Sequence, residues 1–188
     1  MGEEHWRSFR QASVTPEGLN EEESRDLIDG IDSHFEADRA FHTNPVFENL
    51  CLESAQRIRR VYGTPSTRVS FMVHVSIELL LDATLSENDP ELLPRYYETL
   101  ERVDGQRLES GANQIHGSPL PQFQLFLRRF LESRFLYSYA TDASLLERLQ
   151  QILRRARLEP AHPSFTSHLQ QLRVEVQRQW KALLGSWA

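Results

Sequence analysis

Capping and proline motifs divide this chain of 188 residues into segments of helical length. Asn20 precedes three glutamates, the pattern of a capped helix start with acidic residues in its first turn. Proline follows Asn44, Thr64 and Asp89, and proline is favoured at the first position of a helix. Because runs of β-branched residues are scarce and only nine prolines and eight glycines interrupt the chain, we predict an all-α fold.

The expected architecture is a single-domain bundle of about six helices over the whole chain, since no shift in composition separates two domains. Residues 1–19 are expected to be irregular or poorly packed, and the glycine-containing stretch 104–118 is predicted to be a loop. The aromatic-rich stretch 119–139 is predicted to be one helix whose rings pack in the core. Thr141 or Asp142 is expected to cap the helix that follows.

The composition also limits where the protein works and what it binds. The single Cys51 excludes an intramolecular disulfide and suits a reducing compartment, and the sequence starts without the apolar stretch of a signal peptide. No segment approaches about 18 consecutive apolar residues, so we expect no membrane span. A net charge of −6 argues against nucleic-acid binding, and 39% hydrophobic residues are compatible with a homodimer. We therefore expect a cytoplasmic protein.

Two predicted helices carry the same triplet of ionisable side chains at positions i, i+4 and i+8. The triplets are His34, Asp38 and His42 in the first helix and His74, Glu78 and Asp82 in the second. At about 100° per residue, such a triplet lies within an arc of about 80°. Leu27, Ile31 and Phe41 share the first arc, and Phe71 and Leu81 share the second. Both triplets are therefore predicted to point inward.

Inward histidines and carboxylates on two helices are the arrangement that metal sites in helical bundles use. We take His34, Asp38, His74 and Glu78 as the candidate ligands. Positions i and i+8 lie about 12 Å apart along a helix, so either two ions are bound or one member of each triplet lies outside the ligand set. Imidazole and carboxylate ligands suit manganese, iron or zinc better than calcium. The alternative is a buried hydrogen-bond network, His34 to Glu78 and His74 to Asp38, without a metal.

The stretch GIDSHFEADRAFHTNPVF resembles the region of acyl carrier protein phosphodiesterases that reads Gly-Ile-x-x-His-Arg-x-Ile-Asp-x-Phe-Thr-Asp-x-x-Pro. The matching residues are Gly30, Ile31, His34, Asp38 and Pro45. VHVSIELLLD is similar to the Asp-His-Phe-Leu helix of that family, with His74 on its histidine, and RFLYSYATDASLLERLQQILRR is similar to a later segment. Val73 and His42 stand where the family has aspartate. The resemblance covers about residues 25–185.

This resemblance implies an α-helical fold akin to the HD-domain metal hydrolases. It also implies the family reaction, the manganese-assisted hydrolysis that removes 4′-phosphopantetheine from holo acyl carrier protein. Asp38, His42 and Asp82 are then the candidate catalytic residues, the last two as further ligands or proton-transfer groups. The second hypothesis is a non-catalytic helical protein that keeps the His and carboxylate cluster as a structural or interaction feature.

An asymmetry of charge indicates a partner site. Residues 1–100 carry a net charge of −10, whereas residues 101–188 carry one of +4. All but one of the 21 cationic residues are arginine, which binds carboxylate and phosphate groups bidentately. We predict that an acidic carrier protein binds at Arg154, Arg155 and Arg157. The alternative is that these arginines only cover solvated helix faces.

Overall fold

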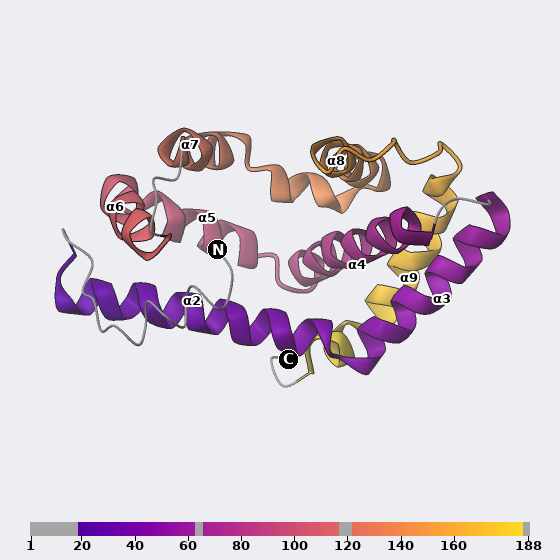
Figure 1. Ribbon diagram of the computed structural model, residues 1–188, viewed down its shortest axis with the longest axis horizontal. Coiled ribbons are helices and arrows are strands. Elements are labelled where there is room, and N and C mark those ends of the chain that lie inside the picture. The colour runs from indigo at the N-terminus through magenta and orange to yellow at the C-terminus, as the bar shows by residue number, and fades with distance from the viewer. Residues whose placement is uncertain (1–18, 63–65, 117–121, 186–188) are drawn as a thin grey trace. The chain divides into compact units, whose positions relative to one another are not determined.

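The computed structural model describes residues 19–62, 66–116 and 122–185 (Figure 1). Within these residues the regular structure is helical and contains no strand, which confirms the all-α prediction. The irregular segment predicted for residues 1–19 lies outside the described residues, apart from Leu19. The elements are α2 (Glu21–His42), α3 (Pro45–Tyr62), α4 (Ser66–Asn88), α5 (Leu92–Glu101), α6 (Gly105–His116), α7 (Phe123–Ser133), the 3-10 helix η1 (Phe135–Ala140), α8 (Asp142–Arg155) and α9 (Phe165–Leu184).

The chain forms two compact units. The first unit comprises Met1–Arg39 and Tyr96–Arg134, and the second comprises Ala40–Arg95 and Phe135–Ala188. Because the boundaries fall within α2 and α5, each of these helices contributes residues to both units. The single-domain organisation stays a prediction.

Helix α4 is the centre of the second unit. It packs against α3, α8, α9 and η1, and Figure 1 shows α3 and α9 beside it. Val73, Ile77 and Leu80 of α4 have no exposed surface, and they meet fully buried leucines such as Leu145 and Leu169 in one core. Each fully buried aliphatic side chain stabilises the fold by about 1.5–3 kcal/mol relative to an exposed one. This core therefore fixes where the side chains of α4 point.

Helix α4 is also long and apolar enough to cross a membrane, with a mean hydropathy of 1.4 over Arg68–Asn88. However, 61% of its apolar window is buried inside the structure. The core helix of a soluble protein has the same length and composition, so this finding does not by itself indicate a membrane span.

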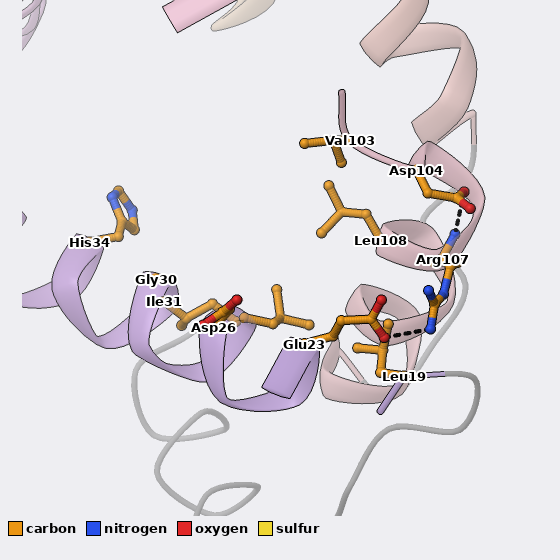
Figure 2. A pocket seen from close by; sticks show the side chains of 11 residues that line it. Leu19, Glu23, Asp26, Gly30, Ile31, His34, Val103, Asp104, Arg107 and Leu108 are labelled. Carbon is orange, nitrogen blue, oxygen red and sulfur yellow. Dashed lines mark hydrogen bonds and ion pairs between the residues drawn. The ribbon is translucent and has the colours of Figure 1, made fainter. Parts of the chain in front are cut away.

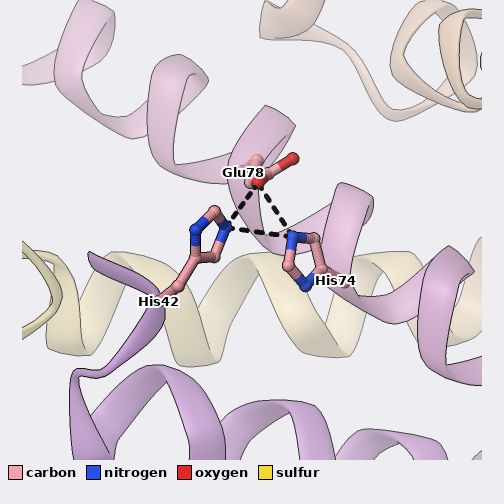
Figure 3. Close-up of side chains that lie close together, drawn as sticks. All are labelled: His42, His74 and Glu78. Atoms are coloured by element: carbon pink, nitrogen blue, oxygen red, sulfur yellow. Dashed lines mark hydrogen bonds and ion pairs between the residues drawn. The ribbon is translucent and has the colours of Figure 1, made fainter. Parts of the chain in front are cut away.

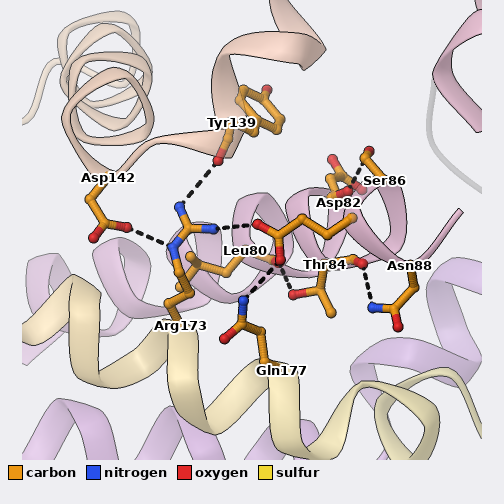
Figure 4. Close-up of polar contacts among 10 residues, drawn as sticks. Leu80, Asp82, Thr84, Ser86, Asn88, Tyr139, Asp142, Arg173 and Gln177 are labelled. Carbon is orange, nitrogen blue, oxygen red and sulfur yellow. Dashed lines mark hydrogen bonds and ion pairs between the residues drawn. The ribbon is translucent and has the colours of Figure 1, made fainter. Parts of the chain in front are cut away.

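Arg173 on α9 connects four elements of the second unit (Figure 4). Its Nε donates to Asp142 Oδ1 of α8 at 2.6 Å, and its terminal nitrogens donate to the Tyr139 carbonyl of η1 and to the Glu87 carboxylate of α4. Gln177, one turn further along α9, donates to the same Glu87 carboxylate at 2.9 Å. Hydrogen bonds to charged groups are among the strongest in proteins. This network links α4, η1, α8 and α9 by directional polar contacts beside the apolar core.

Two predicted helix starts are confirmed in atomic detail. The Glu23 N–H donates to Asn20 Oδ1 and the Asn20 N–H donates to Glu23 Oε2, both at 2.9 Å, which is a reciprocal capping box at the start of α2. Thr141 Oγ1 accepts a hydrogen bond from the Ser144 N–H at 3.3 Å at the start of α8. These side chains satisfy backbone N–H groups that the helix itself leaves without partners.

The loop predicted over residues 104–118 is wrong for most of its length, because Gly105–His116 form α6. Asp104 caps this helix, its Oδ1 accepting hydrogen bonds from the N–H groups two and three residues later. In the sequence, glycine at position 111 indicates a loop, but in the structure its lack of a side chain permits close packing against Leu19. A Cβ atom there would lie only 2.8 Å from the Leu19 side chain.

The single aromatic helix predicted over residues 119–139 is interrupted. Arg134 adopts a left-handed conformation with φ of 41°, and its N–H donates to the Phe130 carbonyl, which ends α7 before η1 begins. The expected burial of the rings holds for Tyr139, which is 4% exposed, but not for Phe126, which is 61% exposed. The interruption coincides with the boundary between the two compact units, so the rings of α7 and those of η1 belong to different units.

Candidate metal centre

Two imidazoles and one carboxylate converge in the second unit (Figure 3). The Nε2 atoms of His42 and His74 lie 3.1 Å apart. Glu78 Oε1 lies 3.2 Å from the first and 3.0 Å from the second of these nitrogens. The three atoms therefore form a nearly equilateral triangle of potential ligands.

His74 and Glu78 come from the central helix, where they lie one turn apart and share one face of α4. The neighbouring residues Val73, Val75 and Ile77 are buried, with at most 7% of their surface exposed. Because these neighbours hold the helix in the core, α4 cannot rotate to take His74 and Glu78 elsewhere. The backbone of α4 thus fixes two of the three ligands.

His42 is the last residue of α2, and the turn into α3 brings it to this face of α4. The side chain of Asn44 in that turn donates to the Ala182 carbonyl of α9 at 2.8 Å, which anchors the turn. The Phe47 ring stands edge-on to both imidazoles, with centroids 5.5 Å from His42 and 5.0 Å from His74. Edge-to-face contacts of this kind are favourable and limit the orientations of both imidazoles.

The spacing of the triangle fits a bound metal ion. Ligand atoms about 2.1 Å from an ion, separated by angles of about 90–110°, lie about 3.0–3.4 Å from one another. The three observed separations of 3.0 to 3.2 Å agree with this geometry. Two histidines with one carboxylate are also a donor set that binds zinc in hydrolases and non-haem iron in oxygenases. The residues thus fit a divalent transition metal.

Hydrogen bonds alone cannot satisfy all three contacts of this cluster at the same time. If both Nε2 atoms carry a proton and donate to Glu78 Oε1, the 3.1 Å contact between His42 and His74 brings two donors together. If one Nε2 atom lacks a proton, that imidazole has no hydrogen to donate to the carboxylate from that atom. A cation at the centre of the triangle accepts a lone pair from all three atoms at once.

The cluster is accessible from solvent. The side chains of His42, His74 and Glu78 are 31%, 38% and 38% exposed, respectively, although most of the other residues of α4 around His74 and Glu78 are buried. Three protein ligands with an accessible side match catalytic metal sites, which keep coordination positions for water or substrate. Structural sites, by contrast, are usually closed by four protein ligands.

The charge of Glu78 acts on two further groups of the second unit. Desolvation, followed by the charge of Glu78, raises the pKa of Asp82 to about 6, although the Asp82 side chain keeps contact with solvent. Burial, again followed by the charge of Glu78, raises the pKa of the Cys51 thiol to about 11. Cys51 is therefore a protonated, unreactive thiol at neutral pH. Asp82 instead titrates close to neutrality.

The residues predicted as ligands are distributed over both units. His74 and Glu78 belong to the triangle, whereas His34 and Asp38 belong to the first unit. The predicted inward orientation is wrong for Asp82, which is exposed on α4, and for His34 and Asp38, which are exposed on α2. On α2 the reason is that the apolar residues beside His34 and Asp38 are only half-buried and do not hold that arc in a core. Their role as ligands stays a prediction.

From the sequence, His42 is predicted to be a catalytic residue, either a further ligand or a proton-transfer group, and in the structure it completes the group of side chains that could hold a metal ion. One signal in the sequence indicates this position. His42 lies two residues before Asn44, at the turn that leads to the Pro45 start of the next helix, and a residue at such a turn can approach a helix that packs on α3. The predicted partner residues Arg154, Arg155 and Arg157 are all exposed at and beyond the end of α8.

No family model, curated protein or solved structure matches this chain.

Proposed function

We propose that the protein is a divalent-metal-dependent phosphodiester hydrolase. The observation that carries this proposal is the accessible triangle of His42, His74 and Glu78, whose ligand atoms lie 3.0 to 3.2 Å apart. A bound divalent ion would polarise a phosphoryl oxygen and lower the pKa of a bound water molecule. The fixed backbone of α4 and the edge-on ring of Phe47 keep the ligands in place before any substrate binds.

Asp82 is the proposed proton acceptor for this chemistry. It follows Glu78 by one turn on α4, and its pKa of about 6 lies near neutral pH. A general base works best when its pKa is close to the pH at which the enzyme operates. The exposed Asp82 carboxyl can also pass a proton on to solvent.

The proposed substrate is the phosphodiester that joins 4′-phosphopantetheine to a serine of acyl carrier protein, with manganese as the metal and iron or zinc as alternatives. The support for this substrate is the resemblance of residues 30–45 and of the α4 stretch to acyl carrier protein phosphodiesterases. The exposed Arg154, Arg155 and Arg157 are the proposed contacts for an acidic carrier protein. A cytoplasmic location accords with this substrate.

A structural or interaction role is the second candidate. It is favoured by the contacts of Glu78 with His42 at 3.2 Å and with His74 at 3.0 Å, which are ion-pair distances that need no metal. In this case the cluster only orients the end of α2 against α4 within the second unit. Removing one partner would then lower stability by about 1–3 kcal/mol and change no catalytic activity.

The two candidates are distinguished by metal analysis of the purified full-length protein, followed by hydrolysis assays with added Mn²⁺. We expect about one bound transition-metal ion per chain and hydrolysis of holo acyl carrier protein and of simple phosphodiesters. Glu78→Gln keeps the size of the side chain but removes a ligand charge, so turnover should fall by at least about 100-fold. Glu53→Gln, on the exposed surface of α3, is the matched control.

Each result is informative. If the protein binds none of Mn²⁺, Fe²⁺ and Zn²⁺ and cleaves no phosphodiester, the hydrolase proposal is rejected and the structural role is supported. A protein that cleaves simple phosphodiesters but not holo acyl carrier protein supports the hydrolase and rejects the proposed substrate. Charge reversal at Arg154 and Arg155 then tests the partner site, since it should weaken carrier binding and its dependence on salt.

A further inference from the structure

The first unit contains a cavity of about 580 Å³ that the metal centre does not involve (Figure 2). This volume falls within the range of pockets that bind small molecules. Five of the eleven lining residues are aliphatic, including Leu27 and Ile31 of α2 and Val103 and Leu108 from around the start of α6. The charged lining residues lie among and beside them, so the cavity combines an apolar body with a polar edge.

Gly30 leaves much of this space open. It lies in the interior of α2, and a Cβ atom built there would meet nothing within 4 Å. Glycine in a helix interior costs about 0.5–1 kcal/mol relative to alanine, so this position carries a local penalty. Any larger side chain at Gly30 would project into the cavity, which makes the position a natural place to block it.

The charged residues around the cavity favour a cation. Glu23, Asp26 and Asp104 contribute three carboxylates, against one guanidinium from Arg107. Arg107 is already held by Glu23, with which it forms an ion pair, and Asp104 accepts hydrogen bonds from backbone N–H groups at the start of α6. Within the described part of the chain no hydrogen bond or ion pair engages Asp26. Its carboxylate is therefore available to a ligand.

We propose that this cavity binds a small amphiphilic amine, with an aliphatic chain in the apolar body and an ammonium group on Asp26. Aliphatic rather than aromatic ligands are expected, because the apolar part of the wall is aliphatic and the imidazole of His34 is the one aromatic ring among the lining residues. The excess of carboxylates disfavours a fatty acid of equal length. This binding activity is independent of the proposed hydrolase function, since every lining residue belongs to the first unit.

The test uses the full-length protein and calorimetric titration with hexylamine, octylamine and decylamine below the concentrations at which they aggregate. Octanol and octanoate serve as neutral and anionic probes. We expect saturable binding that tightens about fourfold for each added methylene group, as burial of that group in an apolar pocket predicts. Octylamine should bind more tightly than octanol, and octanol more tightly than octanoate.

Two variants assign the site. Asp26→Asn should weaken octylamine binding about fivefold and leave octanol binding unchanged, because only the amine uses the carboxylate. Its control is Asp29→Asn, an exposed position on α2 outside the cavity. Gly30→Met should weaken binding of all chain lengths at least tenfold by filling the cavity, whereas Ser33→Met, outside the cavity wall, should not.

The proposal is overturned if no saturable binding occurs, if octanoate binds as tightly as octylamine, or if Gly30→Met leaves affinity unchanged. Helical content measured by circular dichroism verifies that Gly30→Met is folded. If Gly30→Met is not folded, the test uses the ratio of octylamine affinity to octanol affinity in Asp26→Asn. A ratio equal to that of the wild type rejects the site, and a ratio near one supports it. Metal content and hydrolysis are measured separately and do not bear on this result.

Discussion

Helices α2 and α4 carry the same spacing of ionisable residues, yet they place them in different surroundings. In each helix a histidine is followed by a carboxylate one turn later, at His34 and Asp38 in α2 and at His74 and Glu78 in α4. In α4 most of the neighbouring residues are buried, whereas Ser24 is the buried residue of α2.

The difference shows what converts a spacing into a site. Packing of α4 against α3, α8 and α9 fixes its rotation, so His74 and Glu78 must point along the one face that the core leaves accessible. On α2 the apolar residues are only half-buried and the side chains of His34 and Asp38 are exposed, with His34 at the wall of the cavity in the first unit. Equal spacing therefore gives convergent ligands only where enough apolar surface is buried around it.

The largest expected effect tests this difference in packing directly. Leu80→Ala on α4 removes a fully buried side chain and should lower the free energy of unfolding by about 3 kcal/mol, within the usual range of 2–5 kcal/mol. Ile31→Ala on α2 removes a half-buried one and should cost less than about 1.5 kcal/mol. Urea denaturation with matched m-values measures both. Equal costs would show that the two helices are equally packed.

The second prediction concerns metal affinity. His74→Ala should weaken Mn²⁺ and Zn²⁺ binding by at least about 100-fold, or about 2.7 kcal/mol, because one of three ligands is lost. His34→Ala should change the affinity less than about twofold, since its imidazole is exposed on the first unit. Competition with a chromophoric chelator measures both constants. A tenfold loss in His34→Ala would restore His34 as a ligand and break the comparison.

The third prediction is that enlarging a side chain has opposite effects on stability in α4 and in α2. Val73→Ile inserts one methylene into the core around α4 and should cost about 1–3 kcal/mol through overpacking. Gly30→Ala adds a methyl group to α2 where nothing lies within 4 Å, and should stabilise the protein by about 0.5–1 kcal/mol. Thermal unfolding monitored by circular dichroism gives the sign of each change. If Val73→Ile stabilised the protein, the core around α4 would contain unfilled space.

The smallest expected effect is the pH dependence at the solvent-facing edge of α4. The pKa of Asp82 is raised from its ordinary value of 3.8 to about 6, so the folded protein holds this proton more tightly than the unfolded chain. Its contribution to stability is therefore present below about pH 4 and is lost as the pH rises through about 6. Asp82→Asn should stabilise the protein at pH 7.5, by less than about 1 kcal/mol because solvent screens the side chain.

The pH series supplies its own control. The gain from Asp82→Asn should vanish below about pH 4, where Asp82 is protonated in both states. It should also shrink in a Glu78→Gln background, because the charge of Glu78 is the second cause of the raised pKa. Both comparisons are made by urea denaturation in the presence of a chelator. A gain that is constant from pH 4 to pH 8 would contradict the shift.

Much of the helical framework could be read from local signals. Asn20 with Glu23, Asn44 before Pro45, and Thr141 at the start of α8 each satisfy backbone groups within a few residues. Such short-range hydrogen bonds depend little on the rest of the fold, so their sequence patterns predict helix starts reliably. Local patterns gave the wrong prediction at α6, where they indicate a loop. Gly111 permits close packing against Leu19, and this contact joins residues that are distant in the chain.

The sequence by itself determined that the chain is helical, where most helices begin, and that histidines and carboxylates recur one turn apart. Only the tertiary structure decided that His42, rather than a residue further back on α2, meets His74 and Glu78. The physical reason is that periodicity gives the direction of a side chain relative to its own helix axis. Which of these directions meets a partner depends on how the buried surfaces of α3, α4 and α9 pack together.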